Sequence, residues 1–411
     1  MSTHYVIIGN SAAAVGCVEG IRQIDKEGKI TVIASEPYHT YSRPLISYLL
    51  CGKTTEEKMK YRKDGFYEEN GCEALLGRTV TAVDPKKKQV ALDDGSSVSY
   101  DRLLVATGSR PFVPPMEGLD RVDQKFTFMS LADARALQAA LTKESRVLIV
   151  GAGLIGLKCA EGIFDKVKSL TVLDLANRIL PSILDETGSA MVQKYIEGKG
   201  VSFILNDSVK KFSETNAELN SGRTVDFDIL VVAVGVRPNT ALVSDAGGRV
   251  NRGIAVDEAC LTTLPDVYAA GDCTESFDIA AEENRILALL PNAYMQGECA
   301  GINMAGGKKL YDKAIAMNAI GFFGLHMITA GNYKGEEFIT ETGDSYKKLV
   351  YENDVLKGYI LIGQVARAGI YTALIRDKTP LSSIDFDLIR EKPQLMAFSK
   401  TDRANKLARH A

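Results

Sequence analysis

Residues 146–163 read RVLIVGAGLIGLKCAEGI, and the chain continues with LTVLD at 170–174. An apolar run, a glycine turn, an amphipathic stretch and a second apolar run are typical of a strand–helix–strand unit with parallel strands, whose connection is right-handed. The glycines of the turn have the spacing GxGxxG, and the second run ends in Asp174, 23 residues after Gly151. This combination predicts a dinucleotide-binding fold.

Each residue of this motif has a physical task. Gly151 makes the tight turn, Gly153 lets the backbone approach a pyrophosphate, and Gly156 lets the helix pack on the strand, while the helix N-terminus faces the phosphates. The Asp174 carboxylate accepts both ribose hydroxyls and repels a 2′-phosphate, so NAD(H) is preferred over NADP(H). Arg178, four residues later, softens that preference. The alternative is a close-packed turn without a ligand.

A second copy of the pattern opens the chain as YVIIGNSAAAVGCVEGI and KITVIASE. Gly9, Ser11 and Ala14 take the three glycine positions, which keeps the turn small. Ala34 directly follows the second apolar run, and Glu36 comes two residues later. We expect Glu36 to reach an adenosine ribose, the alternative being an exposed loop carboxylate.

Three further apolar runs end in glycine turns: LLVATGSRP at 103–111, LVVAVGVRPN at 230–239 and VYAAGDC at 267–273. Glycine at the carboxyl end of a strand allows close approach of a ligand. Each segment alone is equally compatible with an ordinary loop.

The last quarter of the chain has a different pattern. A helix is predicted from about Pro291 to Ala305, because glycines follow it at 306 and 307. Residues 312 to about 385 then alternate as strands do, before a helical stretch GIYTALIRD. We expect a small α+β domain there. Together with the two strand–helix–strand units, this predicts an α/β protein that has two Rossmann-like domains and a small C-terminal α+β domain.

Composition limits the classes of function. The 411 residues include 49 Lys and Arg against 52 Asp and Glu, a formal net charge of −3, which disfavours binding to nucleic acid or an anionic membrane. No apolar run approaches the roughly 20 residues that cross a bilayer. We therefore expect a cytoplasmic protein.

The seven cysteines form no CxxC or CxxxxC pair, and the chain has four histidines. The usual local signals for an iron–sulfur cluster, a structural zinc or a dithiol redox centre are missing. We expect no metal, and chemistry supplied by a bound cofactor.

Six motifs resemble those of the FAD-dependent pyridine nucleotide disulfide oxidoreductase family. In order along the chain they are GNSAAAVG, ATG, GAGLIG with Asp174, RILP, AVGVRPN, and the VYAAGD that follows Thr262. The stretch TYSRPLISYLLCGK and the QGECAGINMAGG helix are most similar to its branch of NADH:rubredoxin oxidoreductases. The resemblance implies a glutathione-reductase-like fold, with an FAD domain at 1–113 and 242–311, an NAD domain at 114–241, and a C-terminal interface domain at 312–411.

The resemblance implies FAD and NAD(H) as cofactors. It places Glu36 and the first glycine turn at the adenosine and pyrophosphate, Arg43 and Pro44 by the flavin, Val80 near the adenine and Asp272 at the ribitol. The candidate cofactor-binding residues are Gly9, Ser11, Ala12, Ala13, Glu36, Arg43, Pro44, Val80, Ala106, Thr107, Gly108, Arg110, Gly271, Asp272, Asn292, Gly151, Gly153, Leu154, Ile155, Gly156, Asp174, Arg178 and Gly235.

The chain departs from its relatives at two informative places. Where they carry one or two redox cysteines, this chain reads PYHTYSRPLISY, so no thiol is available there, and Cys51 is expected to be an ordinary buried residue. Lys158 replaces a glutamate, and Tyr48 replaces a lysine. We expect a cation to remain near the flavin and its carboxylate partner to be lost, with Lys158, Arg43 and Tyr48 as catalytic candidates. An exposed helix lysine is the alternative for Lys158.

These features predict an enzyme that takes electrons from NADH into FAD and passes them to a small acidic carrier, rubredoxin or a ferredoxin-like iron–sulfur protein. The enzyme alternatives are an NADH oxidase and a subunit of a nitrite or quinone reductase. The non-enzyme alternative is a nucleotide-sensing flavoprotein. A homodimer is compatible with this interpretation.

The last 22 residues, from Arg390, contain six Lys or Arg and two Asp or Glu. We expect this basic tail to steer an acidic carrier, an effect that salt weakens. A solvated tail without a partner is the alternative.

Overall fold

The computed structural model describes residues 2–399 and 403, and it divides into two compact units. The first unit comprises residues 1–177, 200–277 and 284–312, and the second comprises 178–199, 278–283 and 313–411. The first unit contains two parallel five-stranded sheets, and the second contains an antiparallel one. This is the predicted α/β fold with two Rossmann-like sheets and a small α+β part.

The first sheet contains the two strands of the N-terminal strand–helix–strand pattern. Its order is β19-β7-β1-β2-β3, and all its neighbours are parallel. The bounds are β1 (His4–Ile8), β2 (Lys29–Ala34), β3 (Cys72–Leu76), β7 (Arg102–Val105) and β19 (Val267–Ala269). Strands far apart in the sequence therefore bring the turns that follow them to one sheet edge.

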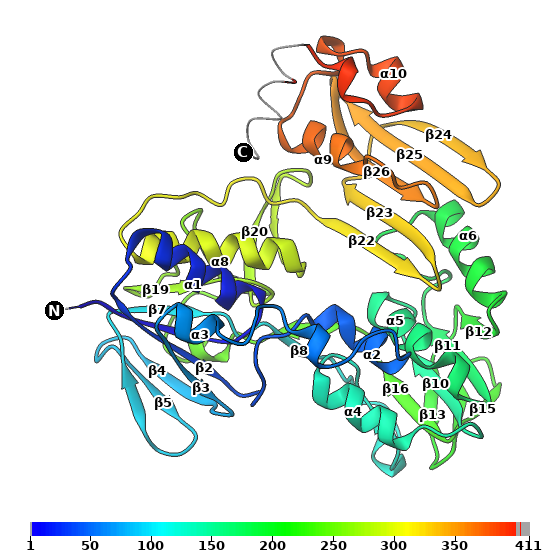
Figure 1. Ribbon diagram of the computed structural model, residues 1–411. Coiled ribbons are helices and arrows are strands. Elements are labelled where there is room, and N and C mark those ends of the chain that lie inside the picture. The colour runs from blue at the N-terminus through cyan, green and yellow to red at the C-terminus, as the bar shows by residue number, and fades with distance from the viewer. Residues whose placement is uncertain (1, 400–402, 404–411) are drawn as a thin grey trace. The chain divides into compact units, whose positions relative to one another are not determined.

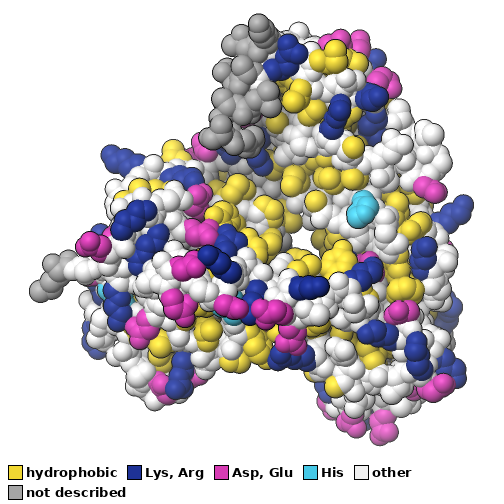
Figure 2. All heavy atoms as spheres, in the orientation of Figure 1, with side chains coloured by type: hydrophobic (Ala, Val, Ile, Leu, Met, Phe, Trp, Pro, Cys, Tyr) yellow, Lys and Arg dark blue, Asp and Glu magenta, His cyan; other side chains and the backbone are white. Residues whose placement is uncertain are grey.

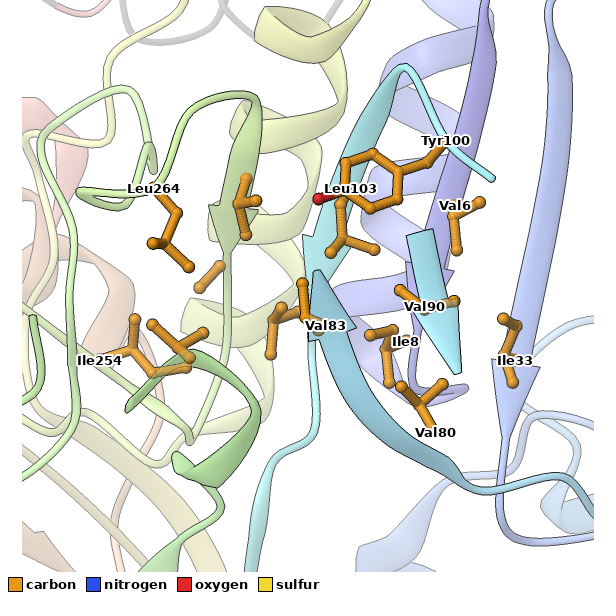
Figure 3. Close-up of a cluster of buried hydrophobic side chains, with 14 of the residues drawn as sticks. Val6, Ile8, Ile33, Val80, Val83, Val90, Tyr100, Leu103, Ile254 and Leu264 are labelled. Carbon is orange, nitrogen blue, oxygen red and sulfur yellow. The ribbon is translucent and has the colours of Figure 1, made fainter. Parts of the chain in front are cut away.

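A small antiparallel sheet packs over this first sheet. It consists of β4 (Val80–Asp84), β5 (Gln89–Leu92) and β6 (Ser97–Ser99). Val6, Ile33, Val80 and Leu103 belong to one buried apolar cluster, which Figure 3 shows between the two layers. Val80, expected near the adenine, lies in this core.

Two helices lie side by side next to the first sheet, α1 (Ala12–Ile24) and α8 (Leu290–Met304), as Figure 1 shows. Glycines make the approach possible. A Cβ atom on Gly16 would come within 2.3 Å of the Tyr294 carbonyl oxygen, and one on Gly301 within 2.2 Å of the Cys17 carbonyl oxygen. Side chains at these positions would push the helices apart.

The second parallel sheet has the order β12-β11-β10-β16-β9. Its bounds are β9 (Lys125–Phe126), β10 (Arg146–Val150), β11 (Ser169–Asp174), β12 (Val201–Leu205) and β16 (Ile229–Val232). The helices α4 (Leu131–Ala140) and α5 (Leu154–Ile163) and a small sheet of β13 (Val209–Phe212), β14 (Asn216–Leu219) and β15 (Thr224–Asp226) complete this part.

The two parallel sheets are joined by a short antiparallel ribbon of β8 (Ser109–Pro111) and β17 (Val236–Pro238). The shorter elements of the first unit, some of which reach the unit boundary, are α2 (Ile46–Leu50), α3 (Phe66–Glu69), α7 (Ala241–Ser244), β18 (Ile254–Ala255), β20 (Thr274–Asp278) and β21 (Glu283–Arg285). The ribbon places ATGSRP beside GVRPN, two of the glycine turns singled out in the sequence.

The second unit contains the antiparallel sheet expected after residue 312, and it also includes residues 178–199 and 278–283, which the sequence analysis placed in the NAD and FAD domains. Its antiparallel sheet has the order β22-β23-β26-β25-β24, with α9 against β26. The bounds are β22 (Met317–Phe322), β23 (Leu325–Gly331), β24 (Glu336–Thr342), β25 (Ser345–Glu352), β26 (Val355–Ile362), α6 (Glu186–Glu197), α9 (Ala368–Arg376) and α10 (Phe386–Glu391). The buried Lys348 of β25 lies between Asp185, which caps α6, and Glu337.

Charged side chains of both signs are interspersed over the face seen in Figure 2, with no broad region of one sign. Across residues 2–399 and 403, no helix has the length and apolar character needed to cross a bilayer. Half of the basic tail, residues 400–402 and 404–411, lies outside the described residues.

Candidate functional site

The turn between β10 and α5 has the geometry that a dinucleotide phosphate needs. Gly151 has φ +118°, and a Cβ atom there would lie 2.3 Å from the Ala233 carbonyl oxygen. A Cβ on Gly156 would lie 1.9 Å from the Gly151 carbonyl oxygen, whereas one on Gly153 would meet no atom within 4 Å. Two glycines therefore serve close packing, and Gly153 borders open space where a phosphate can approach.

Asp174 lies at the end of β11, directly beside this turn. Its Oδ2 accepts a hydrogen bond from the Ala152 amide at 2.6 Å, and its Oδ1 accepts one from the Ala176 amide at 2.8 Å. These bonds hold a negative charge at the mouth of the turn, where it suits ribose hydroxyls and disfavours a 2′-phosphate. Arg178 lies in the second unit.

A small pocket opens beside the same turn. Ile155 and Gly235, both predicted to bind a cofactor, line it together with Pro111, Phe128, Met129, Val232, Ala233 and Val236. No neighbouring atom lies within 4 Å of where a Cβ on Gly235 would sit. The pocket is mainly apolar, and it suits the uncharged face of a ring better than a phosphate.

The predicted FAD turns also converge. Gly9 has φ +120°, and a Cβ there would lie 2.2 Å from the Ala106 carbonyl oxygen. A Cβ on Gly271 would lie 3.3 Å from the Ala13 Cβ, and one on Gly108 would meet no atom within 4 Å. The ends of β1, β7 and β19 thus meet at the start of α1 and leave open space there.

The helices α1 and α5, which follow these turns, and α8, whose first turn packs against Gly271, have no side-chain caps at their N-termini. The N-cap residues of α1, α5 and α8 make no side-chain capping bond, and none of the three first turns contains an acidic residue. By contrast, Ser130 caps α4, Asp185 caps α6 and Asp385 caps α10. An uncapped N-terminus with free amide groups is an anion site, so the residues present fit the phosphates of FAD and NAD(H).

Arg43 and Glu36 lie together rather than apart. Their side chains form an ion pair, and the Tyr41 hydroxyl donates to Glu36 at 2.8 Å and accepts from Arg43 at 3.2 Å. The Arg43 guanidinium lies 5.3 Å from the centre of the Tyr41 ring, and Pro44 lies within the short helical turn Arg43–Leu45. Tyr41 and Arg43 therefore fix the position of the Glu36 carboxylate, which we expected to contact a ribose.

Asp272 follows β19 and lies on the same side of the sheet. Burial raises the pKa of its carboxyl group, while the Ser109 hydroxyl, 3.4 Å away, and the Arg43 charge act in the opposite direction. Ser109 and Asp272 are therefore in contact, and the Arg43 charge is close enough to act on Asp272, although the three residues come from distant parts of the chain. This is a suitable polar border for the ribitol end of FAD.

Thr107 and Arg110 face the ribbon instead of open space. The Thr107 hydroxyl donates to the Asn239 carbonyl at 2.7 Å, the Asn239 amide donates to the Thr107 carbonyl at 3.0 Å, and Arg110 donates to Asn239 Oδ1 at 3.0 Å. Asn239 was not among the predicted site residues, although its motif AVGVRPN was recognised. Asn292, near the start of α8, is buried.

Gln296 is a second polar residue that the sequence did not single out. Its Oε1 accepts from the Gly271 amide at 2.7 Å and from the Thr274 hydroxyl at 3.0 Å. This bond fixes the turn after β19 to α8. The sequence offered no signal that set Gln296 apart from Asn292 and Asn303, the other amide side chains of this helix.

Lys158 and Tyr48 meet, as their complementary exchange suggested, with the Lys158 Nζ 4.5 Å from the centre of the Tyr48 ring. The expected loss of the carboxylate is wrong, because Lys158 forms an ion pair with Glu161, one turn further along α5. The exposed-lysine alternative also fails, since the Lys158 side chain is only 13% exposed. Nothing in the residue pattern distinguished Glu161 from an ordinary surface acid.

Comparison with known proteins agrees with this geometry. The family model described as pyridine nucleotide-disulphide oxidoreductase matches residues 3–297. The chain is 30% identical to the epsilon subunit of NADH-dependent phenylglyoxylate dehydrogenase from Aromatoleum evansii, over 93% of each chain. It is 33% identical to an NADH oxidase from Methanocaldococcus jannaschii, over 73% of this chain and 70% of that one.

A further relative is much longer than this chain. Nitrite reductase [NAD(P)H] from Bacillus subtilis is 29% identical over 92% of this chain, which spans about half (48%) of that protein.

Solved structures share the fold. The chain matches putidaredoxin reductase in its covalent complex with putidaredoxin with a TM-score of 0.87 at 24% identity, over 95% and 96% of the two chains. It matches NADH:rubredoxin oxidoreductase from Clostridium acetobutylicum with a TM-score of 0.76 at 23% identity, over 95% and 100%.

Proposed function

We propose that this protein, which belongs to the pyridine nucleotide-disulphide oxidoreductase family, carries electrons from NADH to a small one-electron carrier protein. It is an oxidoreductase that uses FAD and NAD(H), and its electron acceptor is the proposed part. FAD, when bound, supplies the chemistry, since it takes up two electrons and releases them singly.

The chain's own residues bind and orient the two cofactors. The NADH pyrophosphate binds at Gly153 and the uncapped start of α5, and the NADH ribose binds at Asp174. The FAD pyrophosphate binds at Gly9, Ser11 and the start of α1. Arg43, Ser109 and Asp272 border the flavin end. Holding the two reacting groups in fixed geometry is the main contribution of such a site to the rate.

The observation that carries the choice of acceptor is that the seven cysteines form no disulfide and that none of them is exposed. Cys159 follows Lys158 directly but is fully buried in α5. Cys51, three residues after Tyr48, is half-buried rather than buried as expected, and its Sγ lies 3.5 Å from the Tyr48 carbonyl oxygen. Five of the seven cysteines are buried. Without a dithiol or a peroxide-reactive thiol, electrons leave the flavin directly, which suits a carrier such as rubredoxin or a ferredoxin-like iron–sulfur protein.

A second candidate is NADH oxidase activity, which the 33% identical relative favours. A third is service as the NADH-oxidising subunit of a larger enzyme, which the phenylglyoxylate dehydrogenase subunit favours because the two chains match over 93% of their lengths.

One experiment separates these candidates. The FAD-loaded protein is reduced with NADH under anaerobic conditions, and reoxidation is followed by flavin absorbance after adding air, rubredoxin or ferredoxin. Fast reoxidation by either carrier and slow reoxidation by air support the proposal. Fast reoxidation by air alone supports the NADH oxidase. Slow reoxidation by all three acceptors contradicts the carrier reductase and the oxidase, and it favours a subunit of a larger enzyme or a nucleotide sensor.

A further inference from the structure

One buried hydroxyl group links the part of the first unit around the first sheet to the part around the second. Tyr41 lies in the loop at residues 35–42, which follows β2 and which we call the Tyr41 loop. Its hydroxyl accepts a hydrogen bond at 3.0 Å from the amide of Leu131, the first residue of α4. The same oxygen donates to Glu36 and accepts from Arg43. A hydroxyl donates one bond and accepts two, so its capacity is fully used.

The Tyr41 loop is also bonded to the first glycine turn. Asn10 directly follows Gly9 in that turn, and its side-chain amide donates to the Tyr38 carbonyl at 3.1 Å. Its Oδ1 accepts from the Tyr67 hydroxyl at 2.8 Å, and that hydroxyl accepts from the Thr40 amide at 3.2 Å. These contacts place the loop beside the start of α1, the helix end that we assign to FAD.

At the other end of the link, the start of α4 continues into the wall of the apolar pocket. Phe128 and Met129 line that pocket, and they directly precede Ser130, the N-cap of α4. The Asp133 carboxylate accepts from the Met129 and Ser130 amides, each at 2.9 Å, while the Ser130 hydroxyl accepts from the Asp133 amide at 3.1 Å. This capping box joins the pocket wall rigidly to Leu131.

A second, more exposed link connects the same two segments. Arg135 of α4 donates to the Tyr38 hydroxyl at 3.0 Å, and its guanidinium lies 4.9 Å from the centre of the Tyr38 ring. It also pairs with Glu56, and both side chains are nearly half exposed. Figure 1 shows α4 beside α2, the helix that follows the Tyr41 loop. Because an exposed ion pair contributes little, Tyr41 provides the stronger link.

The hydroxyl group of Tyr41 does more than fill space. A phenylalanine would occupy the same volume and leave the ion pair of Glu36 with Arg43 intact. It would, however, leave the Leu131 amide without its acceptor, and amides in the first turn of a helix have no partner within that helix. The start of α4 therefore depends on a hydrogen bond from a loop 90 residues earlier in the chain.

We propose that Tyr41 is a positioning residue that couples the two nucleotide sites, so that FAD and NADH each raise the affinity for the other. The inference rests on the proposed use of both cofactors. A ligand at the first glycine turn orders the Tyr41 loop, which holds Leu131 and the pocket wall, so the second ligand pays less of that ordering cost. By linkage, the effect is equal in both directions.

The test measures a coupling factor, the ratio of the NAD+ dissociation constants of the full-length protein without and with FAD, by isothermal titration calorimetry. NAD+ is the probe because it cannot reduce oxidised FAD. The ratio should exceed one for the wild type, and Tyr41→Phe should lower it about threefold to tenfold, as expected for one buried hydrogen bond. Direct contact between the two ligands contributes equally to both proteins, so the difference isolates the hydroxyl.

Hydrogen exchange supplies a readout that does not depend on NAD+. Adding FAD alone should slow amide exchange over residues 127–135 in the wild type and should not do so in Tyr41→Phe. Tyr5→Phe is the matched control, because Tyr5 is a buried tyrosine of β1 whose hydroxyl donates to Asp25 at 2.9 Å, away from α4. It should leave the coupling factor and the exchange pattern unchanged.

Arg135→Met keeps the inference testable if Tyr41→Phe does not fold. It removes the outer link and should lower the coupling factor about twofold, in line with the small contribution of an exposed ion pair. In that case an unchanged coupling factor for Arg135→Met overturns the inference.

A purely structural role of Tyr41 weakens NAD+ binding equally with and without FAD, or leaves both constants unchanged, and either result overturns the inference. The proposed function fails separately, if the wild-type protein binds no FAD or if NADH does not reduce it. Normal reduction of wild-type FAD by NADH, with a coupling factor that Tyr41→Phe does not change, refutes only the role of Tyr41.

Discussion

Gly297 of α8 lies so close to Ala13 of α1 that a Cβ atom on Gly297 would come within 2.0 Å of the Ala13 carbonyl oxygen. Gly20 is similar, with a hypothetical Cβ 2.5 Å from the Glu298 carbonyl oxygen. The obstacle in both cases is backbone, which cannot rotate away. The start of each helix lies at the proposed FAD site, so the spacing of α1 and α8 should also determine the position of the two helix ends that we propose bind FAD.

Gly297→Ala should therefore destabilise the protein and weaken FAD retention together. Overpacking of this kind costs about 1–3 kcal/mol, and more where only backbone can move. Thermal unfolding and the ratio of flavin to protein after gel filtration measure the two effects. Gly369→Ala, in α9 with no atom within 4 Å of its hypothetical Cβ, is the control and should change neither. An unchanged melting temperature for Gly297→Ala would show that the helices can separate without cost.

Asp174→Ala should narrow the preference for NADH over NADPH. Removing the carboxylate takes away the repulsion of the 2′-phosphate and the acceptor for the ribose hydroxyls, so kcat/KM should fall about tenfold or more for NADH and rise for NADPH. Asp174→Asn keeps an acceptor for the Ala152 amide and separates the loss of charge from a disturbed turn. Faster reduction of the wild-type protein by NADPH than by NADH at equal concentration would refute the assignment.

Asp272→Asn should stabilise the protein without FAD at neutral pH. Burial raises the pKa of the folded carboxyl group above its ordinary value of 3.8, so the folded state holds that proton more tightly than the unfolded state. Stability then falls as the pH rises from the unfolded pKa through the folded one, and the loss persists at pH 7. Asparagine cannot ionise, so the Asp272→Asn variant does not lose this stability at neutral pH.

Urea unfolding of the wild-type and Asp272→Asn apoproteins between pH 3 and pH 8 measures this effect. The two curves should converge at the acidic end and separate toward neutral pH, while FAD affinity of the variant decreases. A constant difference at every pH would mean that ionisation of Asp272 is not involved.

Truncation after Ser399 should raise the KM for an acidic carrier at low salt and leave NADH-dependent flavin reduction unchanged. The removed residues contain four Lys or Arg and one Asp. Truncation after Pro380 is unsuitable, because Ile389 and Phe398 belong to the core of the second unit. Steady-state carrier reduction over a range of ionic strength is the measurement, and identical salt dependence of both proteins would identify the tail as solvated chain.

The sequence predicted the parts of this molecule that follow from short local patterns. Gly151, Gly153 and Gly156 could be assigned individually because spacing within one turn determines which glycine packs and which borders a ligand. The two parallel sheets followed because a buried run before each glycine turn is typical of a parallel strand.

Relationships between distant segments were harder to predict. Glu161 looked like a surface acid, since its burial depends on α2, more than 100 residues earlier. Arg43 and Glu36 were assigned to different ends of the flavin cofactor, although seven residues apart, because the loop between them folds back through Tyr41. The glycines of α1 and α8 follow a GxxxG spacing, but neither segment contains a pattern that predicts which helix packs against it.

The contact between α1 and α8 also constrains the order of events during synthesis. About 270 residues separate Ile24 from Leu290, so at 5–20 residues per second the first helix leaves the ribosome roughly 15 to 50 s before its partner. The NADH-binding sheet is formed from residues 125–232 and can be complete within that interval. We therefore expect the nascent chain to gain affinity for NADH before it can retain FAD, and the flavin to be loaded only when the chain is nearly finished.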